Sequence, residues 1–349
     1  MKKFILLTIF LFLFFFSVPS THAAEVGLAT TKSLYDLEIV PGSAYEDSIV
    51  VFNRSKELAL PVHMELTLWD IDEDTEEMKF ILAEPALNAT KWFSVGIVKE
   101  QGAKPALRPA EEVGDFILDV DEAREMRFRV SPPADVSPGS YFVMMRFQAV
   151  LPPHYFTDDQ VAPHTIPEIG VLFFIKVGFA TLEGEGSGYN AEVRHLLPKD
   201  TPQLGVFGGF VPGASAGIYE EMVRAFTTKI FNSGLYHFKA SGHIEIQNMF
   251  GAQVARADLP DRYLLPRRTR TFDVSMGKDD PSFFERFLHL GPYTAVMVLN
   301  VPEHDLPIIY TAHFWAFPWK LVTPALFFAG ILILLRRRLV AAIRVLMRR

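Results

Sequence analysis

The 349-residue chain contains no cysteine, so its fold cannot depend on disulfide bonds. Positive charge is also scarce: 34 Lys and Arg residues stand against 41 Asp and Glu, a formal net charge of −7. Such an acidic balance argues against binding to nucleic acid, whose phosphates attract basic proteins. Between its two ends the sequence shows neither a long amphipathic helical pattern nor an internal repeat, which argues against helical and solenoid architectures.

The N-terminus has the pattern of an export signal. Lys2 and Lys3 precede an almost wholly apolar segment, residues 4–18, and small residues follow up to Ala24. This order predicts a signal peptide over residues 1–23, with an uncleaved signal anchor as the alternative. A cysteine-free exported chain of this size is typical of a bacterial or archaeal surface protein, since small secreted animal domains usually rely on disulfides.

The C-terminus has the pattern of a membrane anchor. Residues 321–335 are uncharged and would rise roughly 22 Å as a helix, less than a hydrocarbon core of about 30 Å, but flanking aromatic and basic side chains can extend the span. We predict a transmembrane helix over 317–336 and a basic cytoplasmic tail over 337–349, a buried core helix being the alternative. The side chains expected at the membrane boundary are Trp315, Trp319, Lys320, Arg336, Arg337 and Arg338.

These two ends together predict a single-pass cell-membrane protein. Residues 24–316 would lie outside the cell, the C-terminus in the cytoplasm, and the lipid bilayer would be a partner through the C-terminal helix. Leaving out Lys2, Lys3, Lys320 and the six tail arginines, 25 basic residues remain against 41 acidic ones, so the expected ectodomain has a net charge of −16.

The hydrophobic pattern of the long central region has a period of two. In residues 61–68, Val62, Met64, Leu66 and Leu68 fall on one face and polar side chains on the other. Comparable runs are found at 126–130, 141–147 and 170–177. Pro, Gly and Asn corners separate these runs, which is the pattern of antiparallel strands joined by turns.

Strands of this kind predict an all-β fold. We expect two immunoglobulin-like β-sandwich domains, residues 24–183 and 184–316, followed by a single transmembrane α-helix. The glycine-rich stretch 183–188 is the expected boundary. The strands expected in the second domain are 222–231, 242–248, 270–274, 293–300 and 308–314.

Three runs carry a family resemblance. Residues 37–55 combine a strand, a Pro-Gly turn, a second strand and the corner Asn53-Arg54-Ser55, and residues 128–141 and 231–251 add further strand and turn signatures. Together they resemble the WxL-interacting proteins, a family of bacterial cell-surface proteins with a signal peptide, two β domains, one transmembrane helix and a basic tail. The resemblance implies binding to peptidoglycan and to partner surface proteins near the wall, and it transfers no individual binding residue.

An acidic run, residues 70–77, raises the question of calcium. Asp70, Asp72 and Asp74 match the first three ligands of an EF-hand loop, but Thr75 and Ile81 stand where glycine and glutamate are needed, and no helices flank the run. A solvated hairpin tip is the preferred interpretation, and calcium binding stays open.

A proline-rich loop, residues 151–169, is the first candidate for partner contact. Its histidines and the pair Asp158 and Asp159 match no standard zinc spacing, so no metal site is assigned. Surface loops often carry function, and aromatic side chains can anchor a partner. The candidate contact residues are His154, Tyr155, Phe156 and His164.

No catalytic constellation is found. Gly213-Ala-Ser-Ala-Gly217 matches the Gly-x-Ser-x-Gly motif of a nucleophile elbow, with Ser215 at its centre. An all-β pattern lacks the strand-to-helix context that this motif requires. The glycine-rich stretch that contains it is not followed by a phosphate-loop lysine. We therefore predict no catalytic residue, no metal and no cofactor.

The sequence thus predicts a non-enzymatic, membrane-anchored surface protein. Its immunoglobulin-like domains would bind a wall polymer or another surface protein through exposed sheet edges or loops. An accessory subunit of a membrane protein assembly is the second hypothesis, and a hydrolase of wall glycans is the third.

Overall fold

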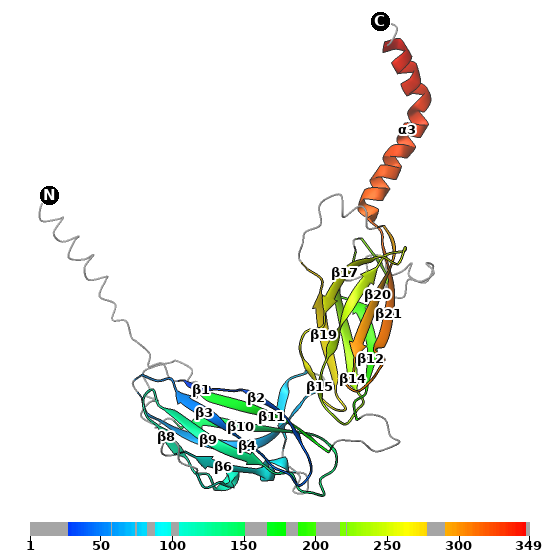
Figure 1. Ribbon diagram of the computed structural model, residues 1–349. Coiled ribbons are helices and arrows are strands. Elements are labelled where there is room, and N and C mark those ends of the chain that lie inside the picture. Colours follow the sequence, from blue (N-terminus) through cyan, green and yellow to red (C-terminus); the bar gives the residue numbers. More distant parts are fainter. Residues whose placement is uncertain are drawn as a thin grey trace, which may run out of the picture. The chain divides into compact units, whose positions relative to one another are not determined.

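The structure is a computed structural model that describes residues 27–56, 58–73, 75–81, 88–98, 105–150, 166–178, 188–199, 217–220, 222–277 and 290–346. It consists mainly of β-strands, which confirms the predicted all-β class (Figure 1). The chain forms two compact units. Unit 1 comprises 1–69, 80–136 and 141–175, and unit 2 comprises 70–79, 137–140 and 176–349.

The described residues of unit 1 form two sheets. The first has the order β1 (Leu28–Thr30), β3 (Tyr45–Asn53), β9 (Ala123–Val130), β6 (Phe93–Ile97) and β7 (Arg108–Pro109). The second has the order β2 (Leu34–Ile39), β11 (Glu168–Val177), β10 (Gly139–Ala149), β4 (Leu60–Ile71) and β5 (Met78–Ile81), with β8 (Phe116–Leu118) paired to β4. Two short 3₁₀ helices, η1 (Ala89–Trp92) and η2 (Ala110–Glu112), lie between strands.

The core of unit 1 is an aromatic cluster drawn from both sheets. The Tyr35 ring of β2 stacks on Phe173 of β11 with centroids 5.0 Å apart, and it meets the edge of Phe128 of β9 at 5.2 Å. Phe93 of β6 packs edge-to-face on Phe173 at 5.0 Å. Because these rings come from strands of two sheets and all are buried, the sheets face each other as a sandwich.

The described residues of unit 2 form three sheets. The smallest pairs β15 (Phe238–Lys239) with β18 (Tyr263–Leu264), and the three-stranded sheet has the order β12 (Ala191–Pro198), β14 (Ala225–Asn232) and β19 (Thr269–Ser275). The five-stranded sheet has the order β13 (Ile218–Tyr219), β21 (Ile308–Ala316), β20 (Gly291–Asn300), β16 (Ser241–Gln247) and β17 (Gln253–Asp258). Its β13 runs parallel to β21, whereas the pairs β21–β20, β20–β16 and β16–β17 are antiparallel.

The strands predicted from alternation are present. The five strands expected in the second domain correspond to β14, β16, β19, β20 and β21, with ends that differ by up to three residues. The strand, turn, strand and corner expected over residues 37–55 correspond to β2, the turn at Pro41 and Gly42, β3 and Asn53. In the second domain, sequence alternation missed β12, β17 and the two-residue strands β13, β15 and β18.

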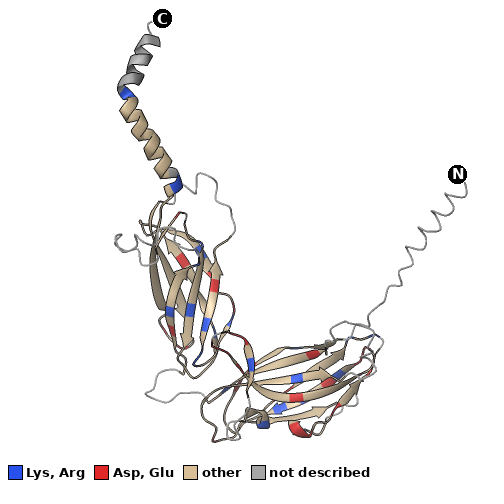
Figure 2. Cartoon of the chain, turned by 180° about the vertical axis from the view of Figure 1, so that it is seen from behind, with Lys and Arg blue, Asp and Glu red and all other residues tan. Residues whose placement is uncertain are grey.

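The prediction of a membrane-spanning helix is wrong. The chain does form a helix there, α3 (Trp319–Leu346), but among the described residues no helix is long and apolar enough to cross a membrane. Figure 2 shows an uncharged stretch between basic residues on this helix, Lys320 and Arg336 in the sequence. As a helix that uncharged stretch rises only roughly 22 Å, short of the about 30 Å that a bilayer core requires. The single-pass membrane location, the assignment of outer and cytoplasmic sides and the bilayer as partner are therefore corrected.

The residues expected at a membrane boundary have other positions. Trp315 belongs to strand β21, where it pairs with Pro292 and Ile218. Trp319 and Lys320 begin α3, and Lys320 Nζ lies 2.6 Å from Glu220 Oε2. The three arginines expected there continue the same helix: Arg336, Arg337 and Arg338.

Several predictions concern residues outside the described ranges. The signal peptide over 1–23, the contact residues His154, Tyr155, Phe156 and His164, and Ser215 all lie there.

Candidate binding surface

The outer face of the five-stranded sheet of unit 1 is the candidate functional site. Alternation on β3 buries Ile49 and Val51 in the core and turns Glu46 and Ser48 outward. The register places Glu46 opposite Arg129 of β9, and Ser48 opposite Arg127. Polar side chains from two strands therefore share one outward face, as expected for a sheet with one buried side.

Gly96 shapes this face. It lies on β6 opposite Arg127, and a Cβ there would come within 2.9 Å of Ala106 O and 3.0 Å of Pro105 Cβ. The absence of a side chain therefore lets residues 105–107 pass closely over the strand. We call residues 105–107 the ridge.

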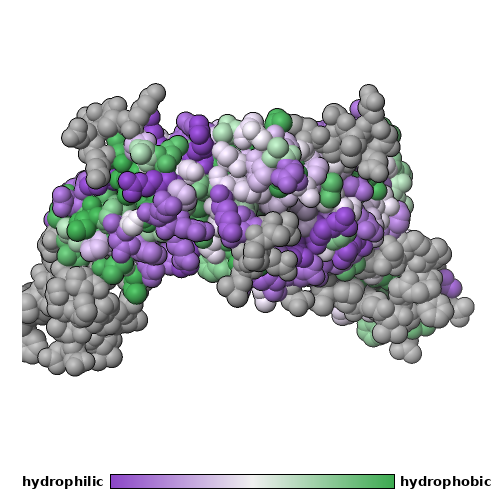
Figure 3. Space-filling view, turned by 90° about the horizontal axis from the view of Figure 1, so that it is seen from below, coloured by the Kyte–Doolittle hydropathy of each residue, from purple (hydrophilic) through white to green (hydrophobic). Residues whose placement is uncertain are grey.

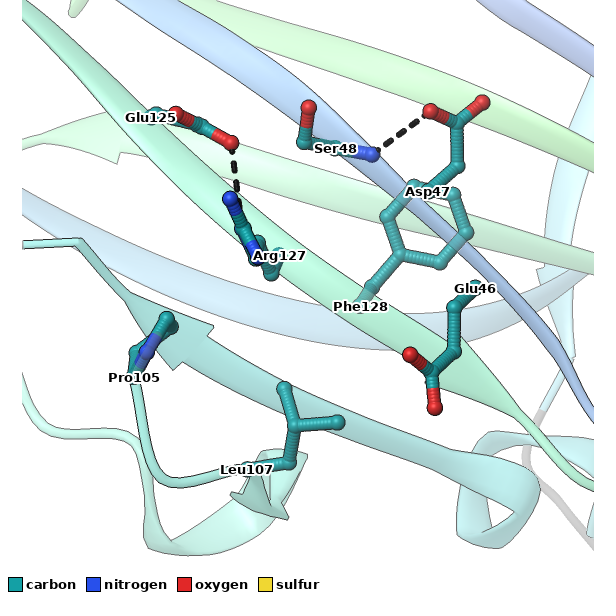
Figure 4. A pocket seen from close by; sticks show the side chains of 8 residues that line it. All are labelled: Glu46, Asp47, Ser48, Pro105, Leu107, Glu125, Arg127 and Phe128. Atoms are coloured by element: carbon teal, nitrogen blue, oxygen red, sulfur yellow. Dashed lines mark hydrogen bonds and ion pairs between the residues drawn. The ribbon is translucent and has the colours of Figure 1, made fainter. Parts of the chain in front are cut away.

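A hollow lies on each side of the ridge. The first has a volume of about 370 Å³ and the second about 390 Å³. Figure 4 shows the first, with Ser48 and Asp47 on β3, Glu125 and Arg127 on β9, and the ridge residues Pro105 and Leu107 on the opposite side. Glu46 and Phe128 complete its lining, and the second hollow is lined by Val95, Gly96, Ile97, Pro105, Ala106, Arg108, Glu112, Val113 and Gly114.

The acidic side chains around the first hollow all have partners. Glu46 Oε1 accepts from Arg129 Nε at 2.6 Å, and Glu125 Oε1 accepts from Arg127 Nε at 3.3 Å. Asp47 accepts from its neighbour's backbone, Ser48 N, at 2.8 Å. The first hollow is therefore lined by carboxylates that already have a basic or a backbone partner.

At Ser48, on the exposed edge of β3, side chains of other residues satisfy both backbone hydrogen-bonding groups. Its N–H donates to Asp47, and its carbonyl accepts from the Tyr35 hydroxyl at 3.0 Å. The Tyr45 hydroxyl donates to the same Asp47 carboxylate at 3.0 Å. Burial, followed by the charge of Asp47, raises the pKa of Tyr35 to about 12. Since both backbone groups are satisfied here, a partner is expected on the face of this sheet and not along this part of its edge.

The acidic run 70–77 forms a hairpin tip, as preferred from the sequence. It joins β4 to β5 and, within unit 2, Asp70 pairs with Arg268, while Glu73 Oε1 lies 2.9 Å from Arg268 Nη1. Asp72 Oδ2 accepts from Lys79 Nζ at 3.3 Å. These carboxylates neutralise basic side chains, and the described residues contain no group of three or more potential ligands that could hold a metal.

Sequence reasoning missed Gly96 and Arg127 as site residues. The alternation of Met126, Phe128 and Val130 already places Arg127 on the exposed face, but an exposed arginine alone indicates no site. Glycine inside the strand Phe93–Ile97 is a sign of close backbone approach. Nothing in the sequence says that the ridge is the segment that approaches it.

Comparisons with known proteins give structural neighbours only. No family model matches the sequence, and no curated protein matches it. A chaperone–tip adhesin complex of CFA/I fimbriae and the class 5 fimbriae chaperone CfaA each share 10% identity at a TM-score of 0.39, covering 82% of this chain and 98% and 99% of theirs. The Salmonella enterica SafA pilin–SafB chaperone complex shares 11% identity at a TM-score of 0.31, covering 85% of this chain and 98% of its own. Likenesses at this level assign neither a function nor a partner to this chain.

Proposed function

We propose that this chain is a non-enzymatic binding protein with immunoglobulin-like units, which holds a segment of another surface protein on the outer face of unit 1. The observation that carries the proposal is the pair of hollows on either side of the ridge. Each has the volume of a small-ligand or side-chain pocket, for which about 300–1,000 Å³ is typical. Two neighbouring pockets suit two side chains of one partner segment.

The chemistry of the first hollow favours a protein partner over a bare glycan. Arginine is enriched in protein interfaces, whereas glutamate is depleted there, and the hollow offers Arg127 with its Nε paired to Glu125. Its one aromatic residue, Phe128, is 1% exposed and packs into the core, so it offers no ring face to a sugar. The face of the molecule shown in Figure 3 carries hydrophilic residues with patches of hydrophobic ones between them.

The resemblance to the WxL-interacting proteins supports the same class of role. It implies contact with partner surface proteins and with peptidoglycan, so a wall polymer is the second candidate ligand. The ion-paired carboxylates of the site support a non-enzymatic role.

The test compares capture by the immobilised full chain and by three variants. Arg127→Glu reverses the charge in the first hollow, and Gly96→Val displaces the ridge that separates both hollows. Arg194→Glu, an equal charge change at an exposed position of β12 in unit 2, is the matched control. Each protein is presented with a surface-protein extract and, separately, with purified peptidoglycan, after its thermal unfolding has been checked.

We expect one extracted protein, identified by mass spectrometry, to be retained by the wild type and by Arg194→Glu and lost by the other two. If peptidoglycan follows this pattern and no protein does, the wall polymer is the ligand. Equal capture by all four proteins would show that the site is placed wrongly.

A further inference from the structure

The strand β17 ends the five-stranded sheet of unit 2 (Figure 1). Among the described strands, only β16 pairs with it. The side chains of Arg256 and Asp258 are 50% and 80% exposed, and Arg256 Nε lies 3.8 Å from Asp258 Oδ1, an exposed pair of little strength. Ala255 and Ala257 pack against the core from the other face. β17 thus has a buried face, a charged outer face and one unpaired edge.

The backbone direction of β17 follows from its bonds to β16. Leu259 N–H donates to Gly242 O, so the odd-numbered residues of this stretch face β16, including Ala257, which lies opposite Ile244. Backbone groups alternate in direction along an antiparallel strand. The N–H and C=O groups of Arg256 and Asp258 therefore point outward along the free edge, ready to pair with another strand.

The charges on the outer face of β17 would match those of a second copy of the chain related to it by a two-fold axis. Arg256 lies opposite Glu245 of β16, and Asp258 lies opposite His243. We propose that β17 pairs antiparallel with β17 of a second copy of this chain, with Arg256 opposite Asp258 of that copy. Each arginine then lies between Glu245 of its own sheet and an aspartate of the second copy, so neighbouring charges alternate in sign across the joined sheets.

This register is selected over its neighbours. Outward-pointing groups must face each other, so a shift can occur only in steps that keep Arg256 opposite an even-numbered residue. The next step places Arg256 opposite Arg256 of the second copy, where like charges repel. In the other direction Arg256 meets Pro260, which has no N–H to donate. The proposed register alone pairs opposite charges and keeps every donor.

The two-fold axis passes between the two Ala257 residues, which allows a direct test. They form a non-hydrogen-bonded pair, whose Cα atoms lie about 4.5 Å apart in antiparallel sheets, a distance that a disulfide can bridge. Since the chain has no cysteine, Ala257→Cys introduces a single thiol. We expect the full-length variant to form a covalent dimer under mild oxidation.

Ala255→Cys is the matched control. Ala255 has the same partly buried, core-facing position, but in the proposed register two such residues are offset by four positions, about 13 Å, and cannot be bridged. Adding Arg256→Asp to Ala257→Cys should weaken association about tenfold and reduce cross-linking, because each change counts twice in a symmetric pair. Adding Asp258→Arg as well restores the opposite charges and should restore the dimer.

Dimers formed through any other surface would not follow this pattern. Equal cross-linking at 255 and 257, no cross-linking at 257, or failure of the charge swap to restore it would overturn the proposal. Hydrogen exchange of the unmodified chain gives a second measurement that is independent of variant folding. The amides of Arg256 and Asp258 should become protected as protein concentration rises, and exchange that is independent of concentration would contradict the pairing.

Discussion

Tyr35 connects the aromatic core of unit 1 to β3 of its five-stranded sheet. Its ring stacks on Phe173, while its hydroxyl donates to Ser48 O. The pKa of about 12 in the folded protein is above the ordinary value of about 10, so the neutral form is favoured by folding. This contribution to stability is complete below about pH 10 and is lost as the pH rises towards 12.

Tyr35→Phe should therefore change the alkaline behaviour of the protein. At neutral pH the variant should lose about 1 kcal/mol of unfolding free energy, because one hydrogen bond to a carbonyl is lost. Between about pH 10 and 12 the wild type should lose stability more steeply than the variant. Urea unfolding across this pH range measures both slopes, and parallel slopes would show that Tyr35 does not titrate with folding.

The corner residue Asn53 shows how far a single position can be predicted. The Asn-x-Ser spelling indicates a turn, and the side chain indeed organises one: Asn53 Oδ1 accepts from Ser55 N at 2.9 Å. Its Nδ2 also donates to the carbonyls of Leu58, at 2.8 Å, and Asp119, at 2.9 Å. That second contact joins segments 66 residues apart, which local sequence signals cannot report.

The sheet elements are constrained where backbones approach closely. A Cβ at Gly242 of β16 would overlap the carbonyl oxygen of Val298 on β20. Gly242 O also accepts from Leu259 N on the β17 side, so the strand is held on both sides. Gly242→Ala should therefore lower the free energy of unfolding by about 1–3 kcal/mol, the usual cost of overpacking.

Gly114→Ala is the control for this prediction. No heavy atom lies within 4 Å of a Cβ built there, so its effect should stay within about 0.5 kcal/mol. Chemical denaturation compares the two variants with the wild type. A similar loss in both would mean that the contact with Val298 does not determine the cost.

Alternation predicted those strands whose two faces differ in polarity. Thr294 and Ala295 of β20 illustrate the pattern, since the polar Thr294 is half-buried and the apolar Ala295 fully buried. The strand β17 was missed because its core-facing residues are alanines and its outer face is charged. The ridge was missed for another reason: its position over Gly96 is a tertiary contact without local periodicity.

The whole chain is acidic, with a formal net charge of −7. A partner that binds such a surface through charges is attracted over a distance that salt shortens. Raising the ionic strength from about 0.1 M to about 1 M reduces the Debye length from about 10 Å to about 3 Å. Capture of the partner by unit 1 should fall over this range.

A partner held mainly by apolar contacts would behave differently. Its capture would be unchanged or strengthened by salt, so the salt dependence of retention decides between charged and apolar recognition. The proposed self-pairing of β17 should weaken in parallel with charged recognition, because its register also depends on opposite charges.

At the scale of the molecule, sequence reasoning succeeded for class and failed for location. The alternation of apolar and polar residues recurs in many strands, so an error in any one strand leaves the predicted all-β class unchanged. The membrane prediction depended on one segment, in which the uncharged stretch between Lys320 and Arg336 is shorter than a bilayer core. A prediction that depends on the length of one apolar segment cannot be checked against other segments of the sequence.

Asn232 ends β14 as Asn53 ends β3, and among the described residues each unit has one such buried amide. Asn232 Nδ2 donates to the carbonyls of Tyr236 and Leu264, both at 2.9 Å. Hydrolysis of either amide to a carboxylate would set an oxygen acceptor against carbonyl oxygens, an arrangement that cannot be satisfied inside the fold. Deamidation of the unfolded chain should therefore be a one-way process that prevents refolding. Mass spectrometry of the refolded and unrefolded fractions after ageing in urea should find aspartate at these two corners only in the latter.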